Sequence, residues 1–374
     1  MSRARAIRIG ISGSYGGMNL GDEAILHAML DQIRGSLEAE VTVFTRNAED
    51  TRRRHGTEAV EIRKQAREEA LEAIRQLDVL VLGGGGILFD GEAEAFLREV
   101  ELARVAGVPV AIYAVSAGPL TQQPVRDLVA KVVNEADLVT VRDNRARHLL
   151  EEVGVRREIE VTADPALLLE PAPIPEGPFA GEGVPEEGPI VGFSVREPGP
   201  AAPEMDVDHY HALLANAADF IVSRLDAHVL FVPMERKVMD MQHSHAVVAR
   251  MKHADRASVL KGDYGSAEVA SIVGRMQLAV GMRLHFLMFA AIQNVPFVAL
   301  PYATKVEGFL EEMGMETPPL GDVSAGVLLA EIDRCWDHRG ELRARIEERL
   351  PALQERARRT HELLLELIRD RVPS

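Results

Sequence analysis

Cysteine is nearly absent from this chain, with one residue, Cys335, among 374. A single thiol excludes a disulfide framework within the chain and a zinc site built from cysteines. Long hydrophobic runs are also missing, since nothing approaches the about 18 uncharged apolar residues of a membrane-spanning helix. The first residues, MSRARAIRIGISG, lack the apolar stretch of a signal peptide. We therefore expect a cytoplasmic protein.

Positive charge is in short supply. The 42 Lys and Arg residues are outnumbered by 58 Asp and Glu residues, and the resulting net charge of −16 disfavours nucleic acid as a partner. Residues 46–67 are a local exception, with cations that include Arg52, Arg53, Arg54, Arg63 and Lys64. This stretch is either a solvated helix or loop face, as charge runs usually are, or a surface for a membrane or an anionic polymer.

What the sequence does contain is a regular alternation of strand and helix patterns. Apolar runs such as AIRIGI, DVLVLGG and VPVAIYAVS are separated by helical stretches such as EAILHAMLDQIRGSL. This alternation predicts a parallel sheet with helices on both faces. Residues 171–189 are rich in Pro, Gly and Glu and predict a linker. A second series of apolar runs follows: PIVGFSV, HVLFVPM, LAVGM and VPFVALPY.

The pattern as a whole predicts an α/β fold of the GT-B kind, with two doubly wound, Rossmann-like domains facing a cleft. The expected boundaries are 1–170 for the first domain, 171–189 for the linker and 190–340 for the second domain. Residues 341–374 predict a C-terminal helical segment, broken near Pro351, that packs across both domains through one apolar face.

Glycines follow the first predicted strand in GISGSYGGMNLGDEAIL. The spacing is not G-x-G-x-x-G, and no acid follows VTVFTRN to hold a ribose, so a dinucleotide site is rejected. One interpretation is a tight turn with Asp22 as a helix cap. The other is a substrate-facing loop, in which Gly17, Asn19 and Asp22 bind an anion or sugar hydroxyls.

Three more strand ends carry candidate residues. The run VLVLGGGG places Gly84 and Gly85 where a ligand could approach the backbone, although close helix–sheet packing would also explain them. The run YAVSAGPL ends in Ser116. Arg142 opens a predicted helix, where the helix dipole disfavours a cation, and this misfit makes it a functional candidate.

The richest stretch is GMRLHFLMFA, residues 281–290, followed by PYATKVEGF, residues 301–309. It places Arg283, His285 and Lys305 at the carboxyl ends of predicted strands, where open α/β sheets bind ligands. These groups favour a small anion with a carboxylate or phosphate. The plain alternative for His285 is a core histidine. Glu235, in FVPMERK, is either an acceptor contact or part of a surface helix.

Together these motifs resemble the polysaccharide pyruvyl transferase family, and in particular the bacterial branch called CsaB. The matching segments are NLGDEAIL, VLGGGGIL, YAVSAGPL, VTVRDNRARHLLEEVGV, TADPALLL, GMRLHFLMFAA and PYATKVEGFLEEMG. The resemblance implies a GT-B-like fold and transfer of pyruvate from phosphoenolpyruvate to a sugar. The implied product is a cyclic ketal, typically on N-acetylmannosamine of a secondary cell-wall polysaccharide linked to S-layer anchoring.

The resemblance implies roles in donor binding and catalysis for Arg142, His285 and Lys305, and Arg283 lies in the same motif. The other roles follow from the positions of the candidates at strand ends, and we expect no cofactor and no metal. The expected catalytic residues are His285 and Arg142. The expected donor-binding residues are Arg283, Lys305, Gly84, Gly85 and Ser116. The expected acceptor-binding residues are Gly17, Asn19, Asp22 and Glu235.

Two rival functions stay open. One is a GT-B glycosyltransferase with a nucleotide-sugar donor, and the other is a non-catalytic protein that binds anionic glycans. If the acceptor is lipid-linked, residues 46–67 are expected to meet the inner membrane face.

Overall fold

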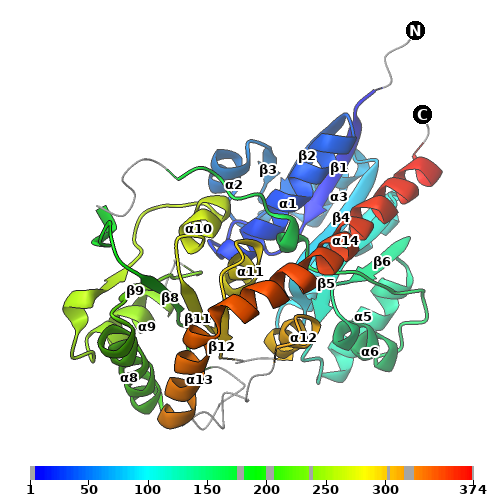
Figure 1. Cartoon of the computed structure of the whole chain (residues 1–374). Helices are drawn as coiled ribbons and strands as arrows, with labels where there is room; N and C mark the ends of the chain where they lie inside the picture. The colour runs from blue at the N-terminus through cyan, green and yellow to red at the C-terminus, as the bar shows by residue number, and fades with distance from the viewer. Residues whose placement is uncertain are drawn as a thin grey trace. The chain divides into compact units, whose positions relative to one another are not determined.

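The computed structural model describes residues 5–174, 181–198, 206–235, 239–300, 304–315 and 324–372. The chain forms two units (Figure 1). Unit 1 comprises Met1–Gly17, Asp22–Leu169 and Leu353–Ser374, and unit 2 comprises Met18–Gly21 and Glu170–Ala352. The domain boundaries given above stay predictions, and residues 175–180 of the predicted linker lie outside the described residues.

Unit 1 is built on a seven-stranded parallel sheet. In spatial order its strands are β3 (Glu58–Val60), β2 (Ala39–Phe44), β1 (Ile7–Ser12), β4 (Val79–Leu88), β5 (Val110–Ala117), β6 (Leu138–Val141) and β7 (Glu160–Val161). Strands β4 and β5 are buried along almost their whole length, which explains their unbroken apolar runs. The strand order reverses between β1 and β4, and doubly wound sheets bind ligands at the carboxyl ends beside such a reversal.

Helices connect these strands in the order that the alternation predicted. They are α1 (Leu20–Ser36), α2 (Ala48–His55), α3 (Arg67–Arg75), α4 (Ala93–Ala106), α5 (Gln123–Asn134) and α6 (Asn144–Glu152), with short 3-10 turns at Ile62–Lys64 and Pro165–Leu168. Ile74, Phe96, Val132 and Leu150, one from each of the helices α3 to α6, lie in one apolar core with the strands. Burial of these stripes stabilises the helices more than their intrinsic propensity does.

Unit 2 has a smaller, five-stranded parallel sheet. In spatial order its strands are β10 (Ala257–Val259), β9 (His228–Phe231), β8 (Ile190–Ser194), β11 (Leu278–Gly281) and β12 (Phe297–Ala299). Its helices are α8 (Val207–Leu225), α9 (Met239–Val248), α10 (Ser266–Val273), α11 (Leu284–Ile292), α12 (Thr304–Glu312) and α13 (Ala325–Asp337), with a 3-10 turn at Ala254–Arg256. The two parallel sheets and the C-terminal helix confirm the predicted fold class.

The C-terminal helix α14 runs from Arg339 to Arg371 and contains Pro351 within it. The predicted break near Pro351 is therefore wrong. Apolar residues on both sides of the proline are buried, among them Leu350 and Leu353, and this packing offsets the hydrogen bond that proline removes. In the part of the chain that the structure describes, no helix is long and apolar enough to cross a membrane.

Candidate active site

Arg142 directly follows β6 and is buried, with 5% of the residue exposed. Its Nη1 donates to Asp164 Oδ2 at 2.7 Å. The next residue, Asp143, caps α6 by accepting from the backbone N–H of Ala146 at 2.7 Å, and its other oxygen accepts from Ser116 Oγ at 3.1 Å. The carboxylates of Asp143 and Asp164 explain how a cation is tolerated at the start of a helix.

The glycine run lies beside this arginine, but it is not the strand end that the sequence predicted. Strand β4 continues through it to Leu88, paired with β5. Within the strand, Gly84 and Gly85 adopt positive φ angles of 56° and 84°, which favour glycine. A side chain on Gly84 would collide with Ile25 of α1, so close helix–sheet packing explains this glycine.

The other glycines of the run lie near candidate side chains. A Cβ atom on Gly85 would stand 3.3 Å from Asp22 Oδ1, and one on Gly86 would stand 4.0 Å from Arg142 Nη2. The carboxyl edge of the unit 1 sheet thus brings together four predicted site residues: Asp22, Gly85, Ser116 and Arg142.

In unit 2, Arg283 occupies the position before α11 and is 8% exposed. Its Nε donates to Asp240 Oδ2 at 3.0 Å and its Nη2 to Asp240 Oδ1 at 2.5 Å. The same Nη2 donates to Glu235 Oε2 at 2.8 Å. Asp240 is fully buried and also accepts from the N–H groups of Met234 and Glu235 at 3.1 and 3.0 Å. Arg283 and Asp240 therefore fix the segment that carries Glu235.

His285 lies in the first turn of α11 and is half-buried. Its ring packs against Gly21, where any side chain would collide with it. Gly21 N donates to Asn19 Oδ1 at 3.0 Å, Leu20 N donates to Met234 O at 2.8 Å, and Asn19 forms an antiparallel bridge with Glu235. The structure thus brings Asn19, Glu235, Arg283 and His285 together in unit 2.

Lys305 is the second residue of α12 and is half-buried. Strands β11 and β12 are paired, so Arg283 and Lys305 follow the carboxyl ends of adjacent strands, as predicted. Residues 301–303 of the same motif lie outside the described residues. The remaining candidate, Gly17, is half-buried in unit 1, where its Cβ would stand 3.4 Å from Arg46 Nη1.

Comparison with known proteins identifies the family of the chain. The sequence profile of the family described as polysaccharide pyruvyl transferase matches residues 19–304. The chain belongs to this family. The match includes most of the candidate residues and ends one residue before Lys305, and membership of a transferase family confirms the prediction of an enzyme. No curated protein sequence matches the chain.

Solved structures of GT-B proteins share the fold of this pyruvyl transferase family member. A UDP-N-acetylglucosamine 2-epimerase matches with a TM-score of 0.67 at 12% identity, over 99% of this chain and 98% of that one. A putative UDP-N-acetylglucosamine 2-epimerase from Listeria monocytogenes gives 0.66 at 12% identity, over 98% and 96%. The ADP-heptose lps heptosyltransferase II of E. coli gives 0.50 at 15% identity, over 89% and 100%. At these identities the likeness shows the fold alone.

A pair of histidines near Arg283 was missed at the sequence level. His211 Nε2 and His243 Nδ1 lie 2.8 Å apart, and burial lowers the pKa of both rings. His243 stands on α9, one turn after Asp240. The two histidines are far apart in the sequence and no motif surrounds either of them, so only the packing of α8 on α9 reveals the pair.

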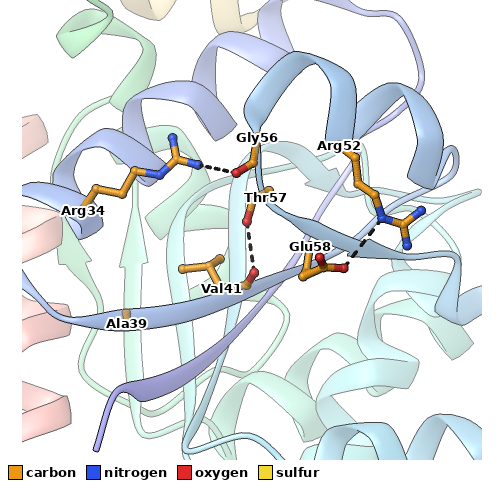
Figure 2. A pocket seen from close by; sticks show the side chains of 7 residues that line it. All are labelled: Arg34, Ala39, Val41, Arg52, Gly56, Thr57 and Glu58. Carbon is orange, nitrogen blue, oxygen red and sulfur yellow. Dashed lines mark hydrogen bonds and ion pairs between the residues drawn. The ribbon is translucent and has the colours of Figure 1, made fainter.

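A pocket of about 420 Å³ lies in unit 1 (Figure 2), and none of its lining residues is a candidate site residue. Its walls include Ala39 and Glu58, the first residues of β2 and β3, so it opens at the amino ends of parallel strands. Arg34 Nη2 donates to Gly56 O at 3.3 Å, and Arg52 Nε lies 3.7 Å from Glu58 Oε2. The cations of this pocket are thus engaged by the chain itself. Among the described residues, no cluster of His, Cys, Asp or Glu suits a metal ion.

Proposed function

We propose that this family member transfers the pyruvyl group of phosphoenolpyruvate to a sugar, closes a cyclic ketal and releases phosphate. The observation that carries the proposal is the unit 2 arrangement, where the buried Arg283 is the N-cap residue of α11 and His285 is the second residue of that helix, within the residues that the family profile matches. An imidazole titrates near neutral pH, which suits a residue that gives and takes protons.

In this mechanism His285 delivers a proton to the methylene carbon of the donor, which becomes a methyl group and leaves C2 electrophilic. A sugar hydroxyl adds to C2 and loses its proton. The bond from C2 to the phosphate oxygen then breaks, and phosphate departs with the electron pair. A second hydroxyl of the same sugar adds to C2, loses its proton and closes the ketal.

Both arginines of the proposed site are paired with carboxylates of the chain. The carboxylates of Asp240 and Glu235 compensate Arg283, and Asp164 compensates Arg142. Lys305 is proposed to bind the carboxylate or the phosphate of the donor, and His285 to act as the acid beside it. Arg142 and Arg283 contribute directional N–H groups, while Gly84, Gly85 and Ser116 shape the donor site.

For the acceptor we propose N-acetylmannosamine in a precursor of a secondary cell-wall polysaccharide, as the resemblance to the CsaB branch implies. Asn19, Asp22, Gly17 and Glu235 are the residues proposed to bind its hydroxyls. Amide, carboxylate and backbone groups suit such a network of hydroxyls.

A cytoplasmic site, with the protein meeting the inner membrane face, is part of this proposal if the acceptor is lipid-linked. Residues 46–67 contain seven cations and four carboxylates, so their net charge is modest. Arg53 and Arg54 bind Asp50, and Lys64 binds Glu61. Liposome co-sedimentation that is unchanged by charge reversal at Arg52, Arg53 and Arg54 would remove the membrane contact.

The test of the function is phosphate release from phosphoenolpyruvate, with and without a synthetic lipid-linked disaccharide that contains N-acetylmannosamine. We expect acceptor-dependent release, lowered by about 10²–10⁴-fold in His285→Ala, as removal of a general acid implies. Near-normal turnover in His285→Ala would refute its role. No release, together with thermal stabilisation by a uridine diphosphate sugar, would instead identify a glycosyltransferase.

A further inference from the structure

Residues 13–17, the first part of the connection between β1 and α1, form a loop that is held by side chains lying outside it. Gly16 N donates to Glu23 Oε1 at 2.8 Å, and Gly13 O accepts from Arg63 Nη2 at 3.4 Å. Within the loop, Tyr15 Oη donates to Gly83 O of β4 at 2.8 Å. All of these residues belong to unit 1. The loop therefore has a fixed backbone in spite of its glycines.

Gly16 is the most constrained position of the loop. Its φ of 71° favours glycine, and a side chain there would collide with Thr45 Oγ1 and stand 2.7 Å from Asn47 N. The Tyr15 carbonyl accepts from Arg46 N at 3.0 Å in the same region. The loop thus rests against the turn between β2 and α2, and a shift of Gly16 would need both neighbours to move.

The carboxylate that holds Gly16 is itself held by a histidine. Glu23 and His55 are buried, with 3% and 4% of their side chains exposed. His55 Nε2 lies 2.7 Å from Glu23 Oε2, while the other carboxylate oxygen accepts from Gly16 N. A buried carboxylate is costly without such partners, so His55 fixes the position of Glu23.

The backbone of His55 is anchored in turn. Its carbonyl accepts from Arg34 Nη2 at 2.7 Å, and its neighbour Gly56 ends α2 in the left-handed conformation. The imidazole therefore projects from a fixed helix end. A continuous chain of contacts leads from α2 through His55 and Glu23 to the N–H of Gly16.

We propose that Glu23 and His55 are positioning residues for the acceptor. Through Gly16 they fix Gly17, and through the first turn of α1 they fix Asp22, whose carboxylate faces Gly85. This inference rests on the proposed function, which makes Gly17 and Asp22 acceptor-binding residues. Neither Glu23 nor His55 needs to touch the substrate.

The test compares three variants of the full chain. In His55→Phe the donor to Glu23 is lost, and we expect kcat/KM for the acceptor to fall about 10²-fold, the effect of misplacing a substrate-binding group by about 1 Å. The KM for phosphoenolpyruvate should change by less than about twofold. General damage to the protein would instead raise the KM values for both substrates. In His55→Gln the amide Nε2 can donate to Glu23, and we expect most of the acceptor kcat/KM to return.

His361→Phe is the matched control. His361 is also a buried histidine of unit 1, and its Nε2 lies 2.7 Å from Ser36 Oγ, away from the loop. We expect a lower Tm in this variant with the acceptor KM unchanged. Two results would overturn the positioning role. One is an equal rise of the KM values for both substrates in His55→Phe, and the other is an equally large fall of kcat/KM for the acceptor in His361→Phe.

Hydrogen exchange separates this inference from the proposed function. Peptides covering residues 13–17 should exchange faster in His55→Phe than in wild type and His361→Phe. Unchanged exchange in His55→Phe would show that His55 does not hold residues 13–17, whether or not the protein has the proposed activity. The proposed function can fail separately. If His55→Phe exchanges faster but the wild type releases no phosphate with the acceptor, Glu23 and His55 still hold the loop and the proposed function is refuted.

Discussion

At the scale of single residues, the candidate site is governed by how its buried arginines are neutralised. Arg142 and Arg283 are almost fully buried, and each binds a carboxylate that is buried more deeply still, Asp164 and Asp240. Removing one partner of such a pair typically costs about 3–5 kcal/mol, because the other charge stays buried. Loss of activity in an arginine variant therefore needs a stability measurement beside it before it is attributed to donor binding.

His228 gives a pH prediction at the same scale. Burial, aided by Arg256, lowers the pKa of His228 to about 4, and its Nε2 lies 2.9 Å from Ser258 Oγ. The folded state therefore binds a proton less readily than the unfolded state, whose histidine has a pKa near 6.5. The contribution of neutral His228 to the free energy of unfolding is therefore present in full above about pH 6.5 and is lost as the pH falls towards 4.

The measurement is urea unfolding of wild type and His228→Gln between pH 7 and pH 4. Glutamine keeps a donor near Ser258 but does not titrate. We expect the wild type to lose more unfolding free energy than the variant between pH 6.5 and 4. Equal losses of unfolding free energy in the two proteins would contradict this, since every titratable group except His228 is common to both.

At the scale of elements, one glycine of β4 and one at the end of α4 both have a positive φ but should have different costs of substitution. Gly84 and Gly107 both have positive φ, 56° and 73°. A side chain on Gly84 would meet Ile25 of α1, whereas Gly107 ends α4 with nothing within 4 Å of the added atom. The difference between them isolates packing from backbone strain.

Gly107→Ala should cost about 1–2 kcal/mol, the usual penalty of the left-handed conformation. Gly84→Ala should cost about 1–3 kcal/mol more, because the added methyl group overpacks the contact with α1. Thermal unfolding of both variants checks the order. Equal costs would mean that α1 moves freely away from β4.

The same strand marks the limit of prediction from sequence. The apolar runs AIRIGI and VPVAIYAVS correctly predicted β1 and β5, because period and burial are local signals. The glycines after the apolar residues VLVL predicted a strand end, yet pairing with β5 keeps Gly83–Gly86 in the strand. That partner is distant in the sequence, and no local pattern contains it.

Prediction of the site has the same character. Arg142, Arg283 and His285 were singled out because each stands at the end of an apolar run, and strand ends are visible in a sequence. Their neighbours were not foreseen as partners, since Asp240 reaches Arg283 from another helix and His55 reaches Glu23 from the end of α2. Their roles in binding and catalysis stay predictions.

At the scale of the whole molecule, the chain returns to unit 1 after completing unit 2. Residues 353–372 at the end of α14 belong to unit 1, where Thr360 Oγ1 donates to Thr162 Oγ1 at 2.7 Å and Gln354 Nε2 to Leu167 O at 3.0 Å. The buried apolar residues of this stretch are Leu353, Ala357, Leu363, Leu364 and Ile368. Unit 1 is thus a product of both ends of the chain.

A chain that ends at Ala352 should therefore fail to fold unit 1. Burial of a leucine or isoleucine side chain is worth about 1.5–3 kcal/mol, so the four large apolar residues together contribute about 6–12 kcal/mol. That is comparable to the whole stability of a typical domain, about 5–15 kcal/mol. We expect the shortened chain to aggregate or to lose its cooperative thermal transition.

A chain that ends at Ile368 is the control, because residues 369–371 are exposed. It loses the ion pair between Arg371 and Asp137 and the last hydrogen bonds of α14, such as that from Arg369 Nε to Leu365 O. It should melt within a few degrees of the full chain, since exposed pairs contribute at most about 1 kcal/mol. Addition of a peptide of residues 353–372 should restore the transition of the chain that ends at Ala352. If that chain folds without the peptide, the end of α14 is an accessory to unit 1, and its buried leucines stabilise a unit that is already complete.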